Sequence, residues 1–166
     1  MPSYTYASYG KRFLAALIDF CVTWIAAVLL FVIAFGLLFS DSIRPLAIVL
    51  IALSILWIPA MIIYNAVIRQ GKSGQTIGKS RMRIRLIKEE SGAPIGVGYA
   101  FLRGLAAYVL NTITGGIFWI IDILFPAFDQ KNQRVIDKML QTVVITEDQS
   151  ASTITQTGVL PPPDYV

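Results

Sequence analysis

Two aspartates that lie within apolar stretches are the residues of this sequence best suited to chemistry. Asp19 lies in an apolar run near the start of the chain, and Asp122 lies in another run far along it. An ionisable side chain inside a membrane-spanning segment costs about 2.5–3.5 kcal/mol on insertion scales, so by default it indicates function. Arg12 lies seven residues before Asp19, and Asn111 lies eleven residues before Asp122. Both spacings are close to whole helical turns, so each pair shares one face if its helix is continuous.

Two interpretations of these polar residues stay open. In the first, Asp19 and Asp122 face each other or a shared cavity, where they bind a cation or relay a proton. Desolvation and a neighbouring arginine shift the pKa of a buried carboxyl in opposite directions, and this competition can poise the group to titrate. In the second, Arg–Asp pairs and asparagine hydrogen bonds only hold the helices in register. Such interhelical contacts average about 0.6 kcal/mol and are common.

Other kinds of site chemistry find little support in the residue types present. The chain has no histidine, which removes the usual general base and the commonest metal ligand, and Cys21 is its single cysteine. Residues 74–80 approach a phosphate-binding loop pattern but lack the preceding buried strand and the spacing. We therefore expect no enzymatic activity, no metal site and no cofactor.

The composition favours a protein whose helices lie in a membrane. Of 166 residues, 55% are hydrophobic and only 14% are charged, whereas soluble domains have about 25% charged residues. Apolar runs at residues 13–39, 45–68 and 104–128 each exceed the roughly 20 residues that a transmembrane helix needs. A signal peptide at residues 13–39 is disfavoured, since its apolar core is only about 7–15 residues long. The short link at residues 40–44 makes the first two runs an antiparallel hairpin.

The distribution of lysine and arginine predicts the orientation of these helices. Eight such residues lie between 69 and 103 and only one lies in the link at 40–44, so residues 1–10 and the loop 69–103 are expected in the cytoplasm. Three crossings place the C-terminus outside, yet Lys131, Arg134 and Lys138 favour the inside. A break at residues 114–116 reconciles the two. We expect an all-α membrane protein with about three transmembrane helices, and a broken or re-entrant third run is the alternative.

The cytoplasmic loop carries a pattern of its own. Residues 81–86 alternate basic and apolar side chains, which is typical of a strand, and the β-branched residues 142–146 could pair with it. The small cytoplasmic β pairing would bring the C-terminal segment to the side of the loop. The basic residues of this loop are expected to face anionic lipid headgroups, at about 1 kcal/mol each; they are Lys79, Arg81, Arg83, Arg85 and Lys88. Nucleic-acid binding is not expected, because no aromatic residues are interleaved for base stacking.

Residues 147–166 differ in composition from the rest of the chain. They are rich in serine, threonine and glutamine and contain three consecutive prolines. Such a segment has too little apolar content to fold, so we expect a disordered tail. A proline-rich ligand motif at residues 162–165 is the less favoured interpretation.

Three motifs in order make the chain resemble the RDD family of small membrane proteins, which is named for an arginine and two aspartates. The motifs are GKRFLAALID at residues 10–19, GQTIGKSRM at 74–82, and RVIDKM with TVV at 134–139 and 142–144. The resemblance covers residues 9–146 and implies an RDD-like membrane domain at 11–146. It assigns Arg12 and Asp19 to the family arginine and first aspartate. Asp122 and Asp137 are both candidates for the second aspartate.

The resemblance implies a transport role, since cation or proton exchange has been suggested for family members. Our first hypothesis is therefore a multi-pass cell-membrane transporter of cations or protons that uses intramembrane carboxylates. Three spans are few for a pathway through one chain, so this hypothesis implies a homo-oligomer or a membrane partner. The alternative is a non-transporting accessory or scaffold protein that binds lipid or a partner through its basic loop.

Overall fold

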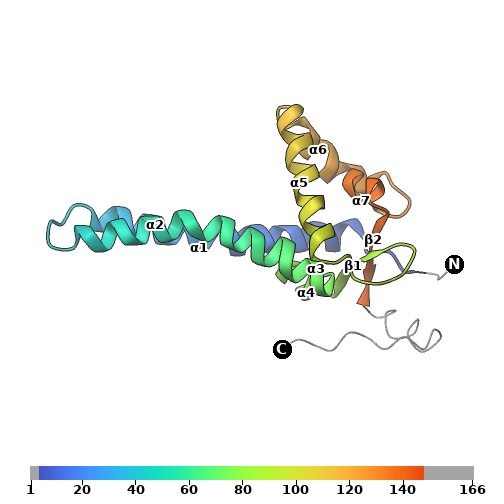
Figure 1. The fold of residues 1–166 in the computed structure, drawn as a ribbon, viewed down its shortest axis with the longest axis horizontal. Coiled ribbons are helices and arrows are strands. Elements are labelled where there is room, and N and C mark those ends of the chain that lie inside the picture. The colour runs from blue at the N-terminus through green and yellow to red at the C-terminus, as the bar shows by residue number, and fades with distance from the viewer. Residues whose placement is uncertain (1–3, 148–166) are drawn as a thin grey trace.

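The computed structural model describes residues 4–147, which form two helical hairpins on a common base (Figure 1). The longer hairpin contains helices α1 and α2, and the shorter one contains α5 and α6. A two-stranded sheet and several short helices make up the base. The two hairpins point away from the base in different directions (Figure 1).

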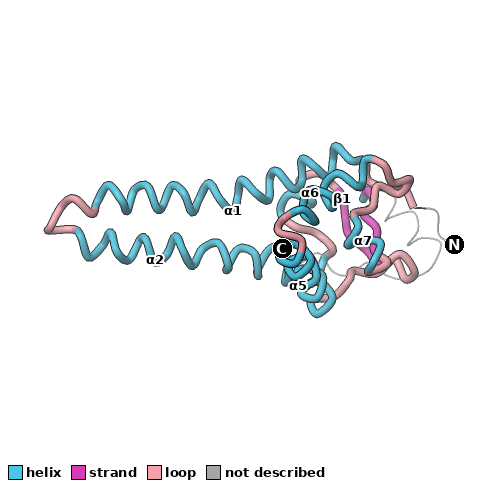
Figure 2. Tube along the Cα trace, turned by 90° about the horizontal axis from the view of Figure 1, so that it is seen from above, coloured by secondary structure: helices cyan, strands magenta, loops and turns pink. Residues whose placement is uncertain are grey.

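The long hairpin is built from two helices that lie side by side and antiparallel (Figure 2). Helix α1 is Tyr9–Leu37, and the side chain of Ser8 caps its first turn by accepting a hydrogen bond from the Lys11 backbone N–H. Helix α2 is Arg44–Met61. It continues through the π-helical segment η1, Ile62–Arg69, into α3, Gln70–Ser73. The wider π segment begins three residues after Pro59, which has no N–H to donate within the helix.

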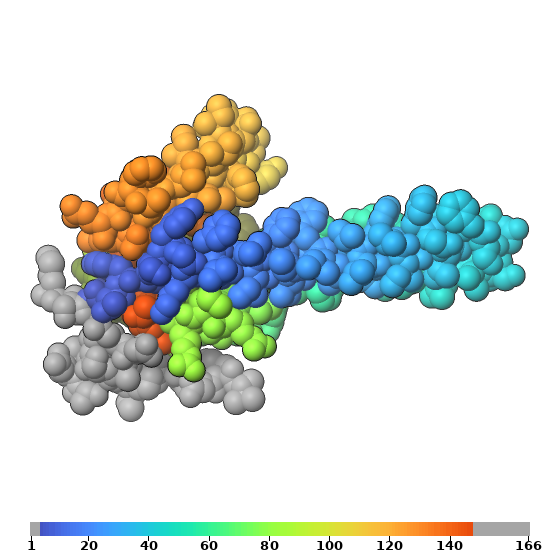
Figure 3. Space-filling view, turned by 180° about the vertical axis from the view of Figure 1, so that it is seen from behind, coloured from blue at the N-terminus to red at the C-terminus, as the bar shows by residue number. Residues whose placement is uncertain are grey.

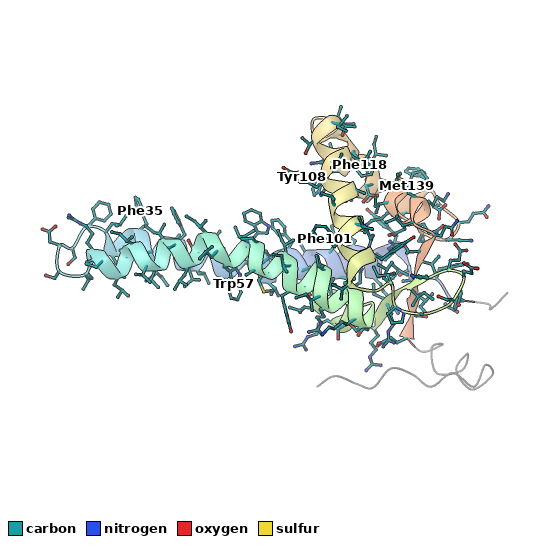
Figure 4. All side chains as sticks on the ribbon, in the orientation of Figure 1. Phe35, Trp57, Phe101, Tyr108, Phe118 and Met139 are labelled. Atoms are coloured by element: carbon teal, nitrogen blue, oxygen red, sulfur yellow. The ribbon has the colours of Figure 1, made fainter. Side chains whose placement is uncertain are left out.

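Both long helices meet the requirements for crossing a membrane. Tyr9–Leu37 and Arg44–Ser73 are 29 and 30 residues long, and only 11% of the most apolar stretch of each is buried within the protein. A core helix of a soluble protein would be mostly buried. The large apolar side chains point outward along the hairpin, as for Phe35 near its far end, which is 52% exposed (Figure 4).

The third apolar run forms a helical hairpin, so the expectation of one continuous span at 104–128 was wrong. Helix α5 is Val97–Ile113, α6 is Ile117–Leu124, and the 3-10 turn η2 is Phe125–Ala127. The chain reverses at Gly115 and Gly116, whose φ angles of 60° and 94° suit residues without a side chain. The alternative of a broken run, which the basic residues after it favoured, is what the structure has.

The small sheet joins segments from the loop and the end of the chain. Strand β1, Ile84–Lys88, pairs antiparallel with β2, Thr142–Thr146, so that Ile84 lies opposite Thr146. The predicted β pairing is therefore confirmed. Residues before α1 join the same assembly, because Tyr6 bridges to Ile145 and the Ala7 N–H donates to the Val144 carbonyl at 2.8 Å. The N-terminal segment, the loop and the C-terminal strand thus lie together.

The base packs directly against the start of α1. Buried side chains from the N-terminal segment, α1, β1, α5 and β2 form one core cluster; it contains Ala7, Ala15, Ile84, Leu86, Ile95, Ala100 and Val144. The short helix α4, Ile77–Arg81, lies against α1 so closely that a Cβ on Gly78 would come within 1.9 Å of the Ala15 carbonyl oxygen. Figure 3 shows α1 lying along this part of the chain. Only glycine fits at position 78.

The short hairpin also exposes apolar side chains. Tyr108 of α5 is 69% exposed, and Trp119 of α6 is 63% exposed (Tyr108 is marked in Figure 4). The helical stretches Val97–Ile113 and Ile117–Ala127 are both shorter than the two long helices. Each falls below the roughly 20 residues that cross the hydrocarbon layer. The predicted tail, beyond Glu147, lies outside the described residues.

The hairpin of α5 and α6, if it enters and leaves the membrane on one side, predicts on which side each exposed loop lies. In a Cys21→Ala background, we expect Glu90→Cys and Gln130→Cys to react with a membrane-impermeant maleimide from one side, and Ser42→Cys from the other. The hairpin returns the chain to the side it left, whereas a third crossing would place position 130 with position 42. Labelling of intact and opened cells checks this. Reaction of Gln130→Cys from the side of Ser42→Cys would contradict the hairpin.

Candidate functional site

An aspartate with no exposed surface joins three parts of the chain. Asp137 lies in the short helix α7, Val135–Met139, and is 0% exposed. Its Oδ1 accepts a hydrogen bond from Arg103 Nη2 of α5 at 2.5 Å, and its Oδ2 accepts one from Arg12 Nη2 of α1. The Arg134 backbone N–H also donates to Oδ2, at 3.1 Å. We call Arg12, Arg103 and Asp137 the clamp, because they tie α1, α5 and α7 together.

The clamp keeps its carboxylate ionised. Burial by itself raises the pKa of Asp137, but the positive charges of Arg103, Arg12 and Arg134 outweigh it and hold the pKa far below the usual range. A carboxyl with a lowered folded-state pKa stabilises the fold above its unfolded pKa, about 4. This contribution is lost only as the pH falls through the lower, folded-state pKa. Asp137 therefore remains a charged structural group at neutral pH.

Asp19 is held by neutral donors rather than by a cation. Its Oδ1 accepts hydrogen bonds from Asn65 Nδ2 and the Gly78 N–H, both at 2.8 Å, and its Oδ2 accepts one from Thr76 Oγ1 at 2.6 Å. Asn65 in turn accepts a hydrogen bond from the Ile77 N–H at 2.8 Å. This carboxylate therefore fixes α4 and η1 against α1. Arg12, which shares its helix, is bound to Asp137 instead.

Asp122 is a residue of α6, and its carboxylate lies against the start of α7. Its Oδ1 accepts a hydrogen bond from the Ile136 N–H at 3.1 Å, and Arg134 Nη1 lies 3.9 Å from its Oδ2. Asn111 does not share a face with it, because the helix breaks between them at residues 114–116. The expected polar stripe of Asn111 and Asp122 on one helix is therefore not formed. The Asn111 Oδ1 is buried and has no hydrogen-bond partner among the described residues.

A cavity of about 300 Å³ opens where the two hairpins meet the base. Asp19 and Asp122 both line it, so the structure places the two aspartates of the first hypothesis at a shared cavity. Six charged side chains belong to its wall; they are Arg12, Asp19, Lys79, Arg103, Asp122 and Arg134. Small residues of α1, η1 and α5, among them Ala16, Ala66 and Ala107, leave the space open. Basic residues outnumber acidic ones in this lining by four to two.

Among the basic residues of the cavity, Lys79 is the one whose positive charge has the least nearby counter-charge. Its ammonium donates to Gln70 Oε1 at 2.8 Å and forms no ion pair with another residue between 4 and 147. Removal from bulk water lowers the pKa of Lys79 well below its usual value, and the charge of Arg103 lowers it further. Lys79 was expected to face lipid with the other basic residues of the loop, but its ammonium lies in the cavity.

The remaining basic residues of the loop occupy three environments. Arg81 and Arg83 are exposed, and Arg85 lies 3.4 Å from Glu147. The Lys88 ammonium stacks over the Tyr99 ring, 5.0 Å from its centre. No group of three or more His, Cys, Asp or Glu in the described part of the chain could hold a metal ion.

The aspartates of this site were predicted from the sequence, but most of their partners were not. Neither Arg103 nor Asn65 was among the predicted site residues. The signal for Asn65 was present, since a polar amide in a strongly apolar helix indicates a buried partner. Nothing local indicated that Arg103 would meet Asp137, 34 residues further along the chain.

Comparison with known proteins supports the family resemblance. The model of the RDD family matches residues 6–141. A protein of Mycobacterium leprae (strain TN), described as proline-rich antigen, is 35% identical over 104 residues, which cover 61% of this chain and 40% of that protein. A proline-rich antigen homolog of Mycobacterium tuberculosis (strain ATCC 25618 / H37Rv) is 35% identical over 86 residues, covering 52% and 34%. The chain thus matches well under half the length of these relatives. No solved structure matches it.

Replacing the buried carboxylate tests the clamp. We expect Asp137→Asn to lower the free energy of unfolding by about 3–5 kcal/mol, because it leaves two arginines buried without their counter-charge. Unfolding in mixed micelles, followed by circular dichroism, measures the change. Asp41→Asn is the matched control, since its ion pair with Arg44 lies exposed at the far end of the long hairpin and should matter little. Equal effects of the two variants would show that the clamp does not support the fold.

Proposed function

This chain belongs to the RDD family, and from that membership and the geometry of its polar site we propose that it is an accessory protein of the cell membrane. Helices α1 and α2 cross the bilayer, and the hairpin of α5 and α6 enters one leaflet and returns. The folded base, with the N-terminal segment and residues 69–103, lies in the cytoplasm. The excess of Lys and Arg in that loop supports this orientation.

The length of the long hairpin supports a position for Asp19 at the edge of the hydrocarbon layer of the membrane. Counting back from the link near residue 40, the 20 residues from Phe20 to Phe39 span about 30 Å as a helix, which is the thickness of the hydrocarbon layer. Asp19 and Arg12 then lie at or beyond the cytoplasmic edge of this layer. This depth removes most of the cost of a charge in hydrocarbon and favours the structural interpretation of both residues.

One observation carries the accessory role: two of the three candidate aspartates, Asp19 and Asp137, are already bonded within the fold. Asp137 is neutralised by two arginines, and Asp19 accepts three hydrogen bonds from neutral donors. A cation at either carboxylate would have to displace the contacts that hold the base on the membrane helices. In the proposed function these aspartates have a structural role, and lipid or a partner protein binds at other surfaces.

The surface best suited to binding lipid is a basic rim, which we define as Lys11, Lys72, Arg81 and Arg83. All four side chains are exposed and form no ion pair with another residue of the described range 4–147. They lie at the start of α1, in α3, and at the end of α4 and just after it. Anionic headgroups attract such residues by about 1 kcal/mol each when they lie near the surface.

Spin-labelled lipids test the basic rim. We expect wild-type protein in bilayers to prefer a spin-labelled anionic lipid over a zwitterionic one, and Arg81→Gln/Arg83→Gln to weaken this preference several-fold. Electron paramagnetic resonance measures the ratio of bound to free lipid for each label. The control Arg44→Gln/Lys138→Gln removes two charges that already have carboxylate partners, so it should change little. No preference in the wild type, or equal loss in both variants, would contradict the proposal.

Transport of cations or protons is the second candidate, and it is favoured by the shared cavity that Asp19 and Asp122 line. Asp122 is the more available of the two carboxylates, because its nearest cation lies 3.9 Å away. Two crossings are too few to enclose a pathway, so a transporter would have to be an oligomer.

A flux assay separates the two candidate functions. For purified protein in liposomes with a pH-sensitive dye, we expect no coupled proton flux under gradients of Na⁺, K⁺ or Li⁺. Flux that disappears in Asp122→Asn and persists in the exposed control Asp41→Asn would overturn the accessory role and establish transport through the cavity.

A further inference from the structure

The cavity has more hydrogen-bond donors than its own acceptors can use. Asp19 already accepts three hydrogen bonds, and Asp137 accepts three beneath the cavity wall. By contrast, the Lys79 ammonium has three donors and one protein acceptor, Gln70. The Arg103 Nε–H is buried and has no acceptor among the described residues. Except for Asp122 Oδ2, which has Arg134 near it at 3.9 Å, these carboxylate oxygens already accept hydrogen bonds within the fold, and several donors have no acceptor within residues 4–147.

The charges of the cavity show the same excess. Lys79, Arg103 and Arg134 come from α4, α5 and the residue before α7, and all three reach one space. Arg134 is only loosely paired, at 3.9 Å from Asp122. Burial, and after it the positive charge of Arg103, lower the pKa of both Lys79 and Arg134. Cations that are brought together out of water are costly unless an opposite charge joins them.

We propose that this cavity binds a phosphate group, with Lys79, Arg103 and Arg134 as its ligands. A phosphate supplies several acceptor oxygens and one to two negative charges, which match three convergent cations better than a single carboxylate does. Arginine favours such oxyanions, because its planar group donates two parallel hydrogen bonds. A cavity of about 300 Å³ is at the small end of ligand pockets. It can hold the phosphate and a short part of what carries it.

Two sources of phosphate fit this chemistry. The small apolar residues of the cavity wall, Ala16, Ala66 and Ala107, come from membrane helices and the short hairpin, so a lipid headgroup could enter with its glycerol against them. A soluble phosphate could enter from the aqueous side. The site is separate from the basic rim, whose residues do not line the cavity, and it does not depend on whether the protein transports.

The test measures the thermal unfolding midpoint of the full chain with each source in turn. One arm adds inorganic phosphate to protein in a maltoside detergent, which contains no phosphate. The other compares bilayer discs of a glycolipid with and without phosphatidic acid. We expect saturable stabilisation of wild type in at least one arm, and the arm that responds identifies the source. Chloride at equal ionic strength should not substitute.

Variants connect the stabilisation to the proposed ligands. We expect Lys79→Gln and Arg134→Gln to raise the dissociation constant at least tenfold, and Lys79→Arg to keep it within a few-fold of wild type. The control Arg44→Gln removes an exposed charge at the far end of the long hairpin, outside both the cavity and the basic rim, and should bind as wild type does. Without phosphate, Lys79→Gln should unfold no earlier than wild type, because it removes an uncompensated cation. This last expectation separates lost binding from lost folding.

Three results would overturn the proposal. The first is saturable stabilisation of the same size in wild type and Lys79→Gln, which would place the phosphate elsewhere. The second is the absence of any response of wild type in both arms. The third is stabilisation of wild type by Na⁺ or K⁺ in place of phosphate, which would mean that the cavity binds cations. None of these results depends on the lipid preference of the basic rim.

Discussion

The buried ionic contact of Asp137 with Arg12 and Arg103 is the interaction on which the rest of this structure depends. It joins the long helix α1, the short hairpin and α7 at one carboxylate that has no exposed surface. Removing one member of such a group leaves the others charged and buried, which costs more than the contact itself contributes. The three segments must therefore pack together in the folded protein. Because β2 comes directly after α7 in the chain, this packing also brings β2 beside β1.

Asp19 also links separate segments of the chain, but its partners are uncharged. It accepts hydrogen bonds from the Gly78 N–H and Thr76 at the start of α4 and from Asn65 in η1. Because the hydrogen bonds to Asp19 come from neutral donors, none of the cations of the cavity forms an ion pair with it among the described residues. Gly78 makes this contact possible, because any side chain there would collide with the backbone of α1. The close approach of the α4 and α1 backbones and the hydrogen bond from the Gly78 N–H to Asp19 thus depend on each other.

The excess of positive charge in the cavity follows from these two arrangements. Asp137 is turned toward Arg12 and Arg103 beneath the cavity wall, and Asp19 is saturated, so Lys79 and Arg134 face the cavity without a full counter-charge. A chain that used its aspartates to bind cations would leave them open to the cavity. Here Asp19 and Asp137 instead hold the base against the long helices, and the cavity between them is lined by more basic than acidic residues.

The sequence by itself determined the two long apolar helices, the break at Gly115 and Gly116 as an alternative, and a strand pairing with residues 142–146, whose partner it placed at 81–86 and the structure places at 84–88. These features depend on apolar length, glycine and strand alternation, which are local properties. It also identified Arg12, Asp19, Asp122 and Asp137 as candidates, through their types and surroundings. Only the tertiary structure decided that Arg12 binds Asp137, 125 residues away, rather than Asp19 on its own helix, and that Lys79 points into a cavity rather than toward lipid. The physical reason is that an ion pair forms with whichever charge packing brings within reach, and spacing along one helix does not report on neighbouring segments.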